Sequence, residues 1–316
     1  MLKGILDGDL KMTKTINRYL DLCLKCGACT KFCPSGIDVV DVIISAKSEY
    51  FKNHPLEKIK TFFQKYFIFG LIPRIIRTFI RPTKSQKYSK KVLYFGGCGS
   101  KFKGDKAVVK TLNSLNIEVI NPQFHCCGIP YFTRGDLNEF NNSIKSYVKI
   151  LKKYNITDVV TTCASCEKSL KDYTKWASNL PKEDFEYLKK VTIKNIYTYM
   201  HEQKIELALR KPTKVTYHKP CNINNFEDIL WVLNNTKNLD YIEMKDFDKC
   251  CGLNGISKIK EYKIMKRIFN SKRKNILNTD SKHVLTSCLG CEVALKAYSF
   301  GQYKVQDLIE FLSTRL

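Results

Sequence analysis

The chain has 316 residues, of which 44% are hydrophobic and 27% charged, so it can bury a core over about two domains without disulfides. Fourteen cysteines in a chain of this length exclude a small secreted disulfide scaffold. The formal net charge of +24 suits nucleic acid, anionic lipid or an acidic protein as partner. No apolar run reaches the roughly 20 residues of a bilayer span, and residues 1–14 lack the apolar core of a secretion signal. We therefore expect a cytoplasmic protein whose cysteines bind metal or carry out redox chemistry.

Residues 1–54 are predicted to form a helical module around the segment CLKCGACTKFCP at 23–34. The spacing C-x2-C-x2-C-x3-C-P is that of bacterial ferredoxins, whose cysteines ligate a [4Fe–4S] cluster. Structural zinc is the alternative, although zinc sites usually join two C-x2-C pairs that lie far apart. The fourth ligand stays open between the last cysteine of the run and a residue of a dimer mate or partner subunit. The candidate ligands are Cys23, Cys26, Cys29 and Cys33.

Residues 55–90 are predicted to be a basic linker. Within it, PRIIRTFIR at 73–81 predicts an amphipathic helix with Arg74, Arg77 and Arg81 on one side. We expect this helix to dock the protein on a membrane surface or an acidic redox partner. The alternative is a helix that packs on a domain and exposes its basic face to solvent.

Two cysteine sets of nearly equal spacing follow the linker. The first reads C-x27-CCG-x34-C-x2-C and the second reads C-x28-CCG-x35-C-x2-C. The flanking segments also repeat, because KVLYFGGC (91–98) matches KVTYHKPC (214–221) and DVVTTCASC (158–166) matches KHVLTSCLGC (282–291). The sets consist of Cys98, Cys126, Cys127, Cys163 and Cys166, and of Cys221, Cys250, Cys251, Cys288 and Cys291.

Each repeat is predicted to be an α/β domain with a parallel sheet, over 91–205 and 213–316. Short β-rich segments end near Cys98 and Cys221. Apolar residues recur at helical spacing in the segments 105–116, 140–155, 193–200, 262–277 and 305–312. A change in the repeat offset places an insertion at 177–190 of the first domain. Because ligands of open parallel sheets lie beyond the carboxyl ends of the strands, each cysteine set is expected to gather at one rim.

The two sets resemble the cysteine-rich CCG domains found in the B and D subunits of heterodisulfide reductase. The same domains occur in the iron–sulfur subunits of glycolate, lactate and glycerol-3-phosphate oxidoreductases. The segments CCGIPYFTRGD (126–136), YHKPC (217–221) and TSCLGCEVAL (286–295) carry the resemblance. It implies that each five-cysteine set holds an iron–sulfur cluster, either cubane or non-cubane [4Fe–4S]. Five ligands exceed the usual four of zinc.

The sequence departs from these relatives at several points, among them the segment CCGLNG at 250–255, which replaces a glycine-richer turn. Lys219 and Asn222 stand where relatives often have an acid and a histidine, and the ferredoxin-type run occurs once rather than twice. His125 and His218 lie close to cluster cysteines in the sequence. Each is interpreted either as an N–H donor to a thiolate or as an interior histidine with other partners.

The favoured function is an oxidoreductase, or a subunit of one, that passes electrons between an N-terminal [4Fe–4S] cluster and two CCG clusters. The resemblance implies disulfide reduction like that of heterodisulfide reductase. The alternative is an electron-transfer subunit of a flavin-dependent 2-hydroxy-acid or glycerol-3-phosphate oxidoreductase that feeds quinone. The expected partner is a flavoprotein or another redox subunit, with peripheral attachment to the inner face of the membrane.

Two other functions stay open from the residues alone. One is a cluster carrier without turnover of its own. The other is a cluster-stabilised nucleic-acid-binding protein, which the positive charge suggests, but no base-stacking motif supports it. Bound nicotinamide or ATP has no support, because no GxGxxG follows a strand and no P-loop occurs.

Overall fold

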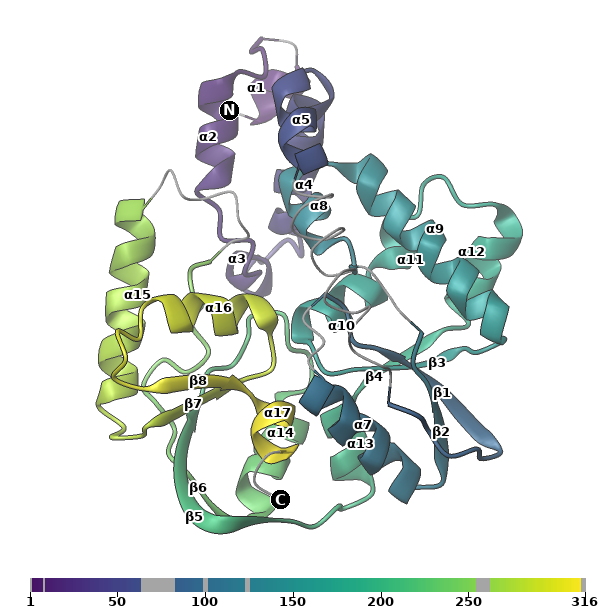
Figure 1. Ribbon diagram of the computed structural model, residues 1–316. Helices are drawn as coiled ribbons and strands as arrows, with labels where there is room; N and C mark the ends of the chain where they lie inside the picture. Colours follow the sequence, from purple (N-terminus) through teal and green to yellow (C-terminus); the bar gives the residue numbers. More distant parts are fainter. Residues whose placement is uncertain are drawn as a thin grey trace.

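The computed structural model describes residues 2–7, 9–63, 83–98, 102–122, 126–253 and 262–313. A group of N-terminal helices lies above two α/β units that stand side by side (Figure 1). The predicted linker helix at 73–81, with Arg74, Arg77 and Arg81, lies outside the described residues, as does His125. None of the helices in the described ranges is both long enough and apolar enough to cross a bilayer.

The first unit has a four-stranded parallel sheet in the order β2-β1-β3-β4. Its strands are β1 (Lys90–Phe95), β2 (Ile117–Ile120), β3 (Asp158–Thr161) and β4 (Thr192–Asn195). Its helices are α7 (Phe102–Ser114), α8 (Ile129–Arg134), α9 (Leu137–Tyr154), α10 (Ala164–Lys171), α11 (Tyr173–Trp176), α12 (Lys182–Lys189) and α13 (Ile196–Glu202). The last four residues of β1 are all buried, as expected for an inner parallel strand that is covered on both faces.

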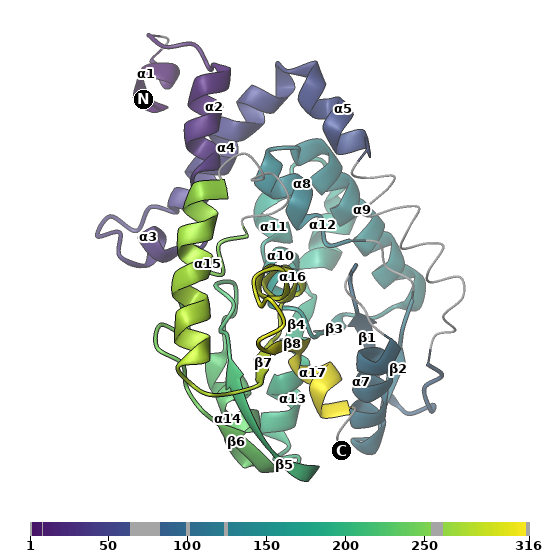
Figure 2. The ribbon, with the colours of Figure 1, turned by 60° about the vertical axis from the view of Figure 1, so that its left-hand side comes forward.

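The second unit repeats this topology, because its parallel sheet has the order β6-β5-β7-β8. Its strands are β5 (Leu207–Tyr217), β6 (Thr236–Tyr241), β7 (His283–Thr286) and β8 (Lys304–Asp307). Its helices are α14 (Phe226–Asn235), α15 (Tyr262–Leu277), α16 (Leu289–Ala297) and α17 (Leu308–Ser313). In Figure 2, α15 lies on the outer side of this sheet. The predicted α/β class with two similar parallel-sheet units is thus confirmed; the predicted domain boundaries stay predictions.

The segments 193–200 and 305–312, expected to be helical throughout, begin as strands. Residues 192–195 pair with β3, and residues 304–307 pair with β7, before the helices α13 and α17 start. Asn195 and Asp307 end these strands and accept hydrogen bonds from backbone N–H groups of the following helix. The predicted insertion at 177–190 contains α12, which joins α11 to β4.

The last helix of each unit packs against the first helix of the other unit. Helix α13 packs against α14, the first helix of the second unit, and α17 packs against α7, the first helix of the first unit. One apolar core therefore contains residues of both units, among them Val92, Leu112, Val215 and Phe311. A shared core of this kind holds the carboxyl ends of the two sheets in a defined relation.

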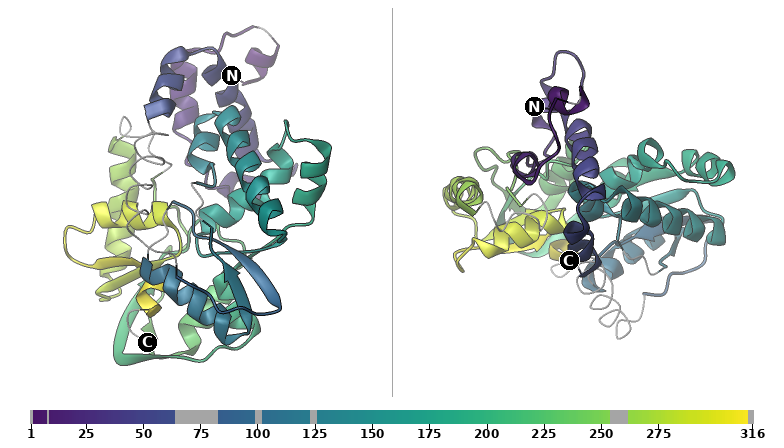
Figure 3. Two further views of the ribbon diagram at one scale, coloured as in Figure 1. Left: turned by 45° about the vertical axis from the view of Figure 1, so that its right-hand side comes forward. Right: turned by 90° about the horizontal axis from the view of Figure 1, so that it is seen from above.

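The N-terminal helices lie over the line between the two units when seen from above (Figure 3, right). They are α1 (Leu2–Leu6), α2 (Lys14–Asp21), α3 (Ala28–Lys31), α4 (Val39–Lys52) and α5 (Pro55–Phe63). Helix α4 packs against α8 of the first unit, and its start is set by the Asp38 carboxylate, which accepts from the backbone of Val40 at 3.1 Å. Lys175 pairs with Asp38 and Asp41, which adds a second attachment to the first unit.

The α4–α8 contact depends on Gly135, which has φ +93°. A Cβ at this position would lie 2.6 Å from the carbonyl carbon of Lys47 in α4. The absence of a side chain therefore serves both the left-handed backbone and the close approach of the N-terminal module.

We expect Gly135→Ala to destabilise the protein by about 2 kcal/mol or more, because backbone strain and a collision with backbone act together. Gly301→Ala is the matched control, since Gly301 has φ +76° but no described atom within 4 Å of the place that a Cβ would take. Anaerobic urea unfolding measures both variants. Equal losses of unfolding free energy would show that the Lys47 contact does not hold the module.

Candidate metal centre

The ten cysteines of the two repeats lie where the strands of both sheets end. Cys98 follows β1 and Cys221 follows β5, while Cys163 and Cys288 lie two residues after the ends of β3 and β7 and cap the next helices. Cys166 and Cys291 lie in the first turns of α10 and α16. The chain turns sharply after each cysteine pair, because Gly128 and Gly252 have φ values of +77° and +83°. The strand topology therefore brings the cysteines of each set to one rim of its sheet, as expected.

The sulfur atoms form a continuous series of contacts within each set. In the first set Cys126 contacts Cys98 and Cys127, and Cys166 contacts Cys127 and Cys163. In the second set Cys250 contacts Cys221 and Cys251, and Cys291 contacts Cys251 and Cys288.

The two sets meet at the interface between the units. Cys163 and Cys288 lie close enough for each thiol to shift the pKa of the other, so the ten thiols form one array with a set at each end. The hydroxyl of Ser165 lies 3.1 Å from the Cys288 sulfur, and the Asn222 amide donates to that hydroxyl at 3.2 Å. The backbone N–H of Ala164 also donates across the interface to the Ser287 carbonyl at 2.8 Å. These contacts fix the distance between the sets.

Crowding gives the thiols very different acidities. The contact with Cys126 is the main cause that holds the pKa of Cys127 well below its ordinary value, and the same contact raises the pKa of Cys126. Contact with Cys221 lowers the pKa of Cys250 to about 3. Ionising one thiol makes ionisation of its neighbours unfavourable, so a full set of thiolates needs positive charge among them. Metal ions supply that charge.

The protein scaffold fixes the cysteine pair of the first set through its backbone. The carbonyl of Cys127 accepts from the Ser169 hydroxyl at 2.8 Å and from the Tyr173 hydroxyl at 2.9 Å, both in the buried interior. All fourteen cysteines are free thiols. Five convergent thiols in each set fit a multi-iron cluster better than a four-coordinate zinc ion.

The second set has a histidine beside it. His218 is completely buried, and one of its ring nitrogens lies within 4.8 Å of the sulfurs of Cys251 and Cys291. Burial is the main cause that lowers the pKa of His218 to about 3, so the ring is neutral and carries one N–H.

The N-terminal cysteine run lies near the second set. Cys26 is close enough to Cys250 and Cys23 for their charges to raise its pKa, after the larger effect of burial. Gly27, with φ +72°, lets the chain turn into α3 between Cys26 and Cys29. Cys29 is exposed, whereas Cys23 and Cys33 are half-buried. The spacing of the run alone did not indicate which of the two sets it would approach.

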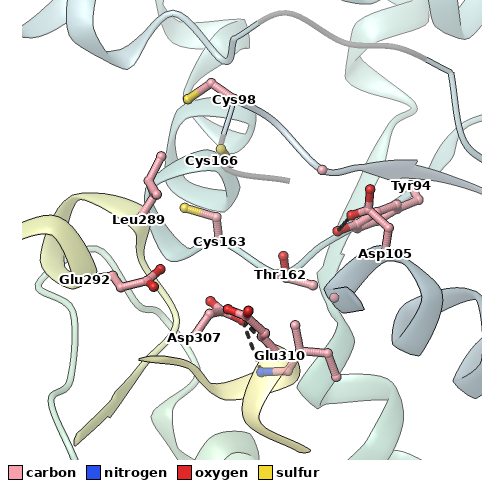
Figure 4. Close-up of a pocket in the computed structure, with 13 residues that line it drawn as sticks. Tyr94, Cys98, Asp105, Thr162, Cys163, Cys166, Leu289, Glu292, Asp307 and Glu310 are labelled. Atoms are coloured by element: carbon pink, nitrogen blue, oxygen red, sulfur yellow. Dashed lines mark hydrogen bonds between the residues drawn. The ribbon is translucent and has the colours of Figure 1, made fainter. Parts of the chain in front are cut away.

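A pocket opens beside the first set (Figure 4). Cys98, Cys163 and Cys166 line one side of it, and Glu292, Asp307 and Glu310 of the second unit line the other. The hydroxyl of Tyr94, also in the wall, donates to Asp105 at 3.0 Å. Cysteines of the first set therefore line this pocket, together with carboxylates of the second unit.

Comparison with known proteins shows the family. The Cysteine-rich domain family, whose domain is abbreviated CCG, matches residues 92–171 and 215–296. The chain belongs to this family. Each matched range contains one five-cysteine set and part of one α/β unit, without that unit's last strand and helix, so the two CCG copies follow the structural repeat.

Several relatives are subunits of redox enzymes by name. The chain is 24% identical to a probable glycolate oxidase iron–sulfur subunit of Bacillus subtilis, over 94% of this chain and 81% of that protein. It is 25% identical to the D subunit of a dihydromethanophenazine:CoB–CoM heterodisulfide reductase of Methanosarcina acetivorans, over 85% of this chain and 70% of that protein.

Two further similarities say less about function, because one covers only part of the relative and the other is of low identity. An iron–sulfur protein of Methanococcus maripaludis is 26% identical over 87% of this chain, which spans only 56% of that relative. A crystal structure of a hypothetical protein from Helicobacter pylori aligns with a TM-score of 0.60 at 11% identity, over 99% of this chain and 66% of that one. The latter supports the fold alone.

We expect Tyr173→Phe to lower the free energy of unfolding by about 1 kcal/mol, because the ring keeps its packing while the Cys127 carbonyl loses one of two donors. Tyr154→Phe is the control, since Tyr154 is exposed. Anaerobic urea titration compares the two variants. If Tyr173→Phe were as stable as Tyr154→Phe, the hydrogen bond to the cysteine pair would not contribute to stability.

Proposed function

We propose that the protein is an iron–sulfur redox subunit with three clusters, one on the N-terminal cysteine run and one on each CCG set. The ten-thiol array between the two units is the observation that carries this proposal. When bound, the clusters would supply one-electron carriers at three adjacent sites. Under this proposal all fourteen cysteines are ligands, and Cys33 completes the N-terminal set.

The positions of the cysteines suggest an order for electron transfer. Cys26 is near Cys250, so the N-terminal site adjoins the second set. The second set meets the first at Cys288 and Cys163, and the first set borders the pocket. Electrons from a partner redox subunit would thus enter at the N-terminal run and reach the pocket through the second set.

Disulfide reduction is the reaction that we propose at this pocket. The S–S bond of the substrate breaks, two electrons arrive from the reduced partner subunit, and two protons from water yield two thiols. The contact between the sets places two one-electron sites next to each other, which suits a two-electron product. The named heterodisulfide reductase relative supports this choice.

The alternative is an electron-transfer subunit of a flavin-dependent oxidoreductase that passes electrons to quinone. The similarity to the glycolate oxidase subunit, which covers most of both chains, supports it. In this case the pocket would hold no disulfide, and the flavoprotein partner would oxidise the organic substrate. An intact protein that exchanges electrons with a flavoprotein or a quinone analogue, but reduces no disulfide with a strong donor, would favour this alternative.

Anaerobic reconstitution should yield on the order of twelve irons per chain, with an equal amount of sulfide, if three four-iron clusters form. Metal and sulfide analysis measures this directly. A content near four irons, or zinc in place of iron, would contradict cluster binding by the CCG sets.

Serine substitutions should separate the sites. We expect Cys26→Ser to abolish reduction by a partner donor while the CCG signals in EPR persist, because the run belongs to a separate module. Cys127→Ser and Cys251→Ser should each abolish disulfide reduction and leave the N-terminal cluster reducible by dithionite. Loss of every signal in Cys26→Ser, or full turnover in either of the other variants, would contradict the assigned roles.

A further inference from the structure

The two CCG sets differ at a buried position beside the cysteines. In the aligned repeats, His218 of YHKPC corresponds to Phe95 of YFGGC, and each residue directly follows the tyrosine at the end of its central strand region. Both side chains are buried, with exposed fractions of 0% and 1%. The fold thus offers the same place twice, but only the second unit fills it with a nitrogen-bearing ring.

The backbone holds His218 firmly in place. Its N–H donates to the Leu285 carbonyl at 2.8 Å, and the next N–H, of Lys219, donates to the Phe247 carbonyl at 3.1 Å. The residue is therefore tied both to β7 and to the loop that leads to the cysteine pair. These bonds fix the backbone of His218 at the rim, and complete burial restricts the ring to the space beside the cysteines.

The His218 ring lacks a polar partner of its own. Within the ranges that the structure describes, neither ring nitrogen has a hydrogen-bonding partner, although the side chain is fully buried. Leaving an N–H unpaired in the interior costs about 1–3 kcal/mol. The groups near the ring that can accept are the sulfurs of Cys251 and Cys291, within 4.8 Å of a ring nitrogen, and the backbone carbonyl of Phe247, which acts against the lowering of the pKa of His218.

We propose that His218 donates an N–H hydrogen bond to a cysteine sulfur of the second CCG cluster and so gives that cluster a higher reduction potential than the first. This inference rests on the proposed cluster binding. A hydrogen bond to sulfur stabilises the more negative, reduced state, and such contacts are a known means by which proteins tune cluster potentials. Phe95 has no N–H, so the first cluster lacks this donor.

The difference between His218 and Phe95 would give the two cysteine sets different roles in electron transfer. The second set lies beside Cys26 of the N-terminal run, whereas the first set borders the pocket. A higher potential at the second set makes it the acceptor of the first electron and the place where that electron is held. His218 is thus a positioning and tuning residue rather than a catalytic one.

The test is an anaerobic redox titration followed by EPR, with the CCG signals assigned through Cys127→Ser and Cys251→Ser. In His218→Phe, we expect the potential of the second cluster to fall by at least the equivalent of a tenfold change in its reduced-to-oxidised ratio, about 59 mV for one electron. The first and N-terminal clusters should keep their potentials. His218→Gln, which retains an N–H donor, should restore most of the shift.

His283→Phe is the matched control, because His283 starts β7 and packs near Phe311 away from the thiol array. It should change no cluster potential. If His218→Phe fails to assemble the second cluster, Phe95→His decides the matter, since a new donor should raise the potential of the first cluster.

Iron content separates failure of this inference from failure of the proposed function. Full iron content with unchanged potentials in both His218→Phe and Phe95→His would overturn the role of His218 and leave cluster binding intact. Strong ¹⁴N coupling that shows a direct Fe–N bond would overturn the hydrogen bond as its form. A wild-type protein without iron in the CCG sets would overturn the proposed function itself.

Discussion

The apolar core that the two units share is the feature on which the rest of the structure depends. Cys163 and Cys288 each follow the third strand of their sheet and cap the next helix, and their contact requires that the two sheets present their carboxyl ends to each other. The exchange of α13 and α17 between the units keeps this orientation by burying apolar side chains of both units together. The thiol array is thus a consequence of how two similar sheets share one core.

The N-terminal module spans both units. Its attachment is to the first unit, through the close contact of α4 with Gly135 and the ion pairs of Lys175. Its cysteine run nevertheless approaches the second set, through Cys26 and Cys250. The module is thus attached to one unit while its cysteines approach those of the other.

Much of this organisation could be predicted from the sequence, because cysteine spacing and strand signals are local. The repeat of C-x27-CCG and C-x28-CCG predicted two parallel-sheet units with cysteines at strand ends, and the topology confirms the class. The strands at 192–195 and 304–307 were missed, since edge-strand pairing depends on neighbours distant in sequence. The contact of Cys163 with Cys288 and the nearness of Cys26 to Cys250 were not predictable, because packing between units leaves no periodic signal. Asn222 stands out in the sequence only as a departure from relatives, and its hydrogen bond to Ser165 gives it a place at the interface.

Magnetic coupling between the two CCG centres tests the central claim most directly. The protein, loaded anaerobically and poised so that both centres are paramagnetic, would be measured by EPR at two microwave frequencies. If the thiols form one array, the spectrum should show a splitting or broadening that is equal in field units at both frequencies, as spin–spin interaction requires. A spectrum that is the plain sum of the two centres, recorded separately in Cys127→Ser and Cys251→Ser, would contradict a shared site.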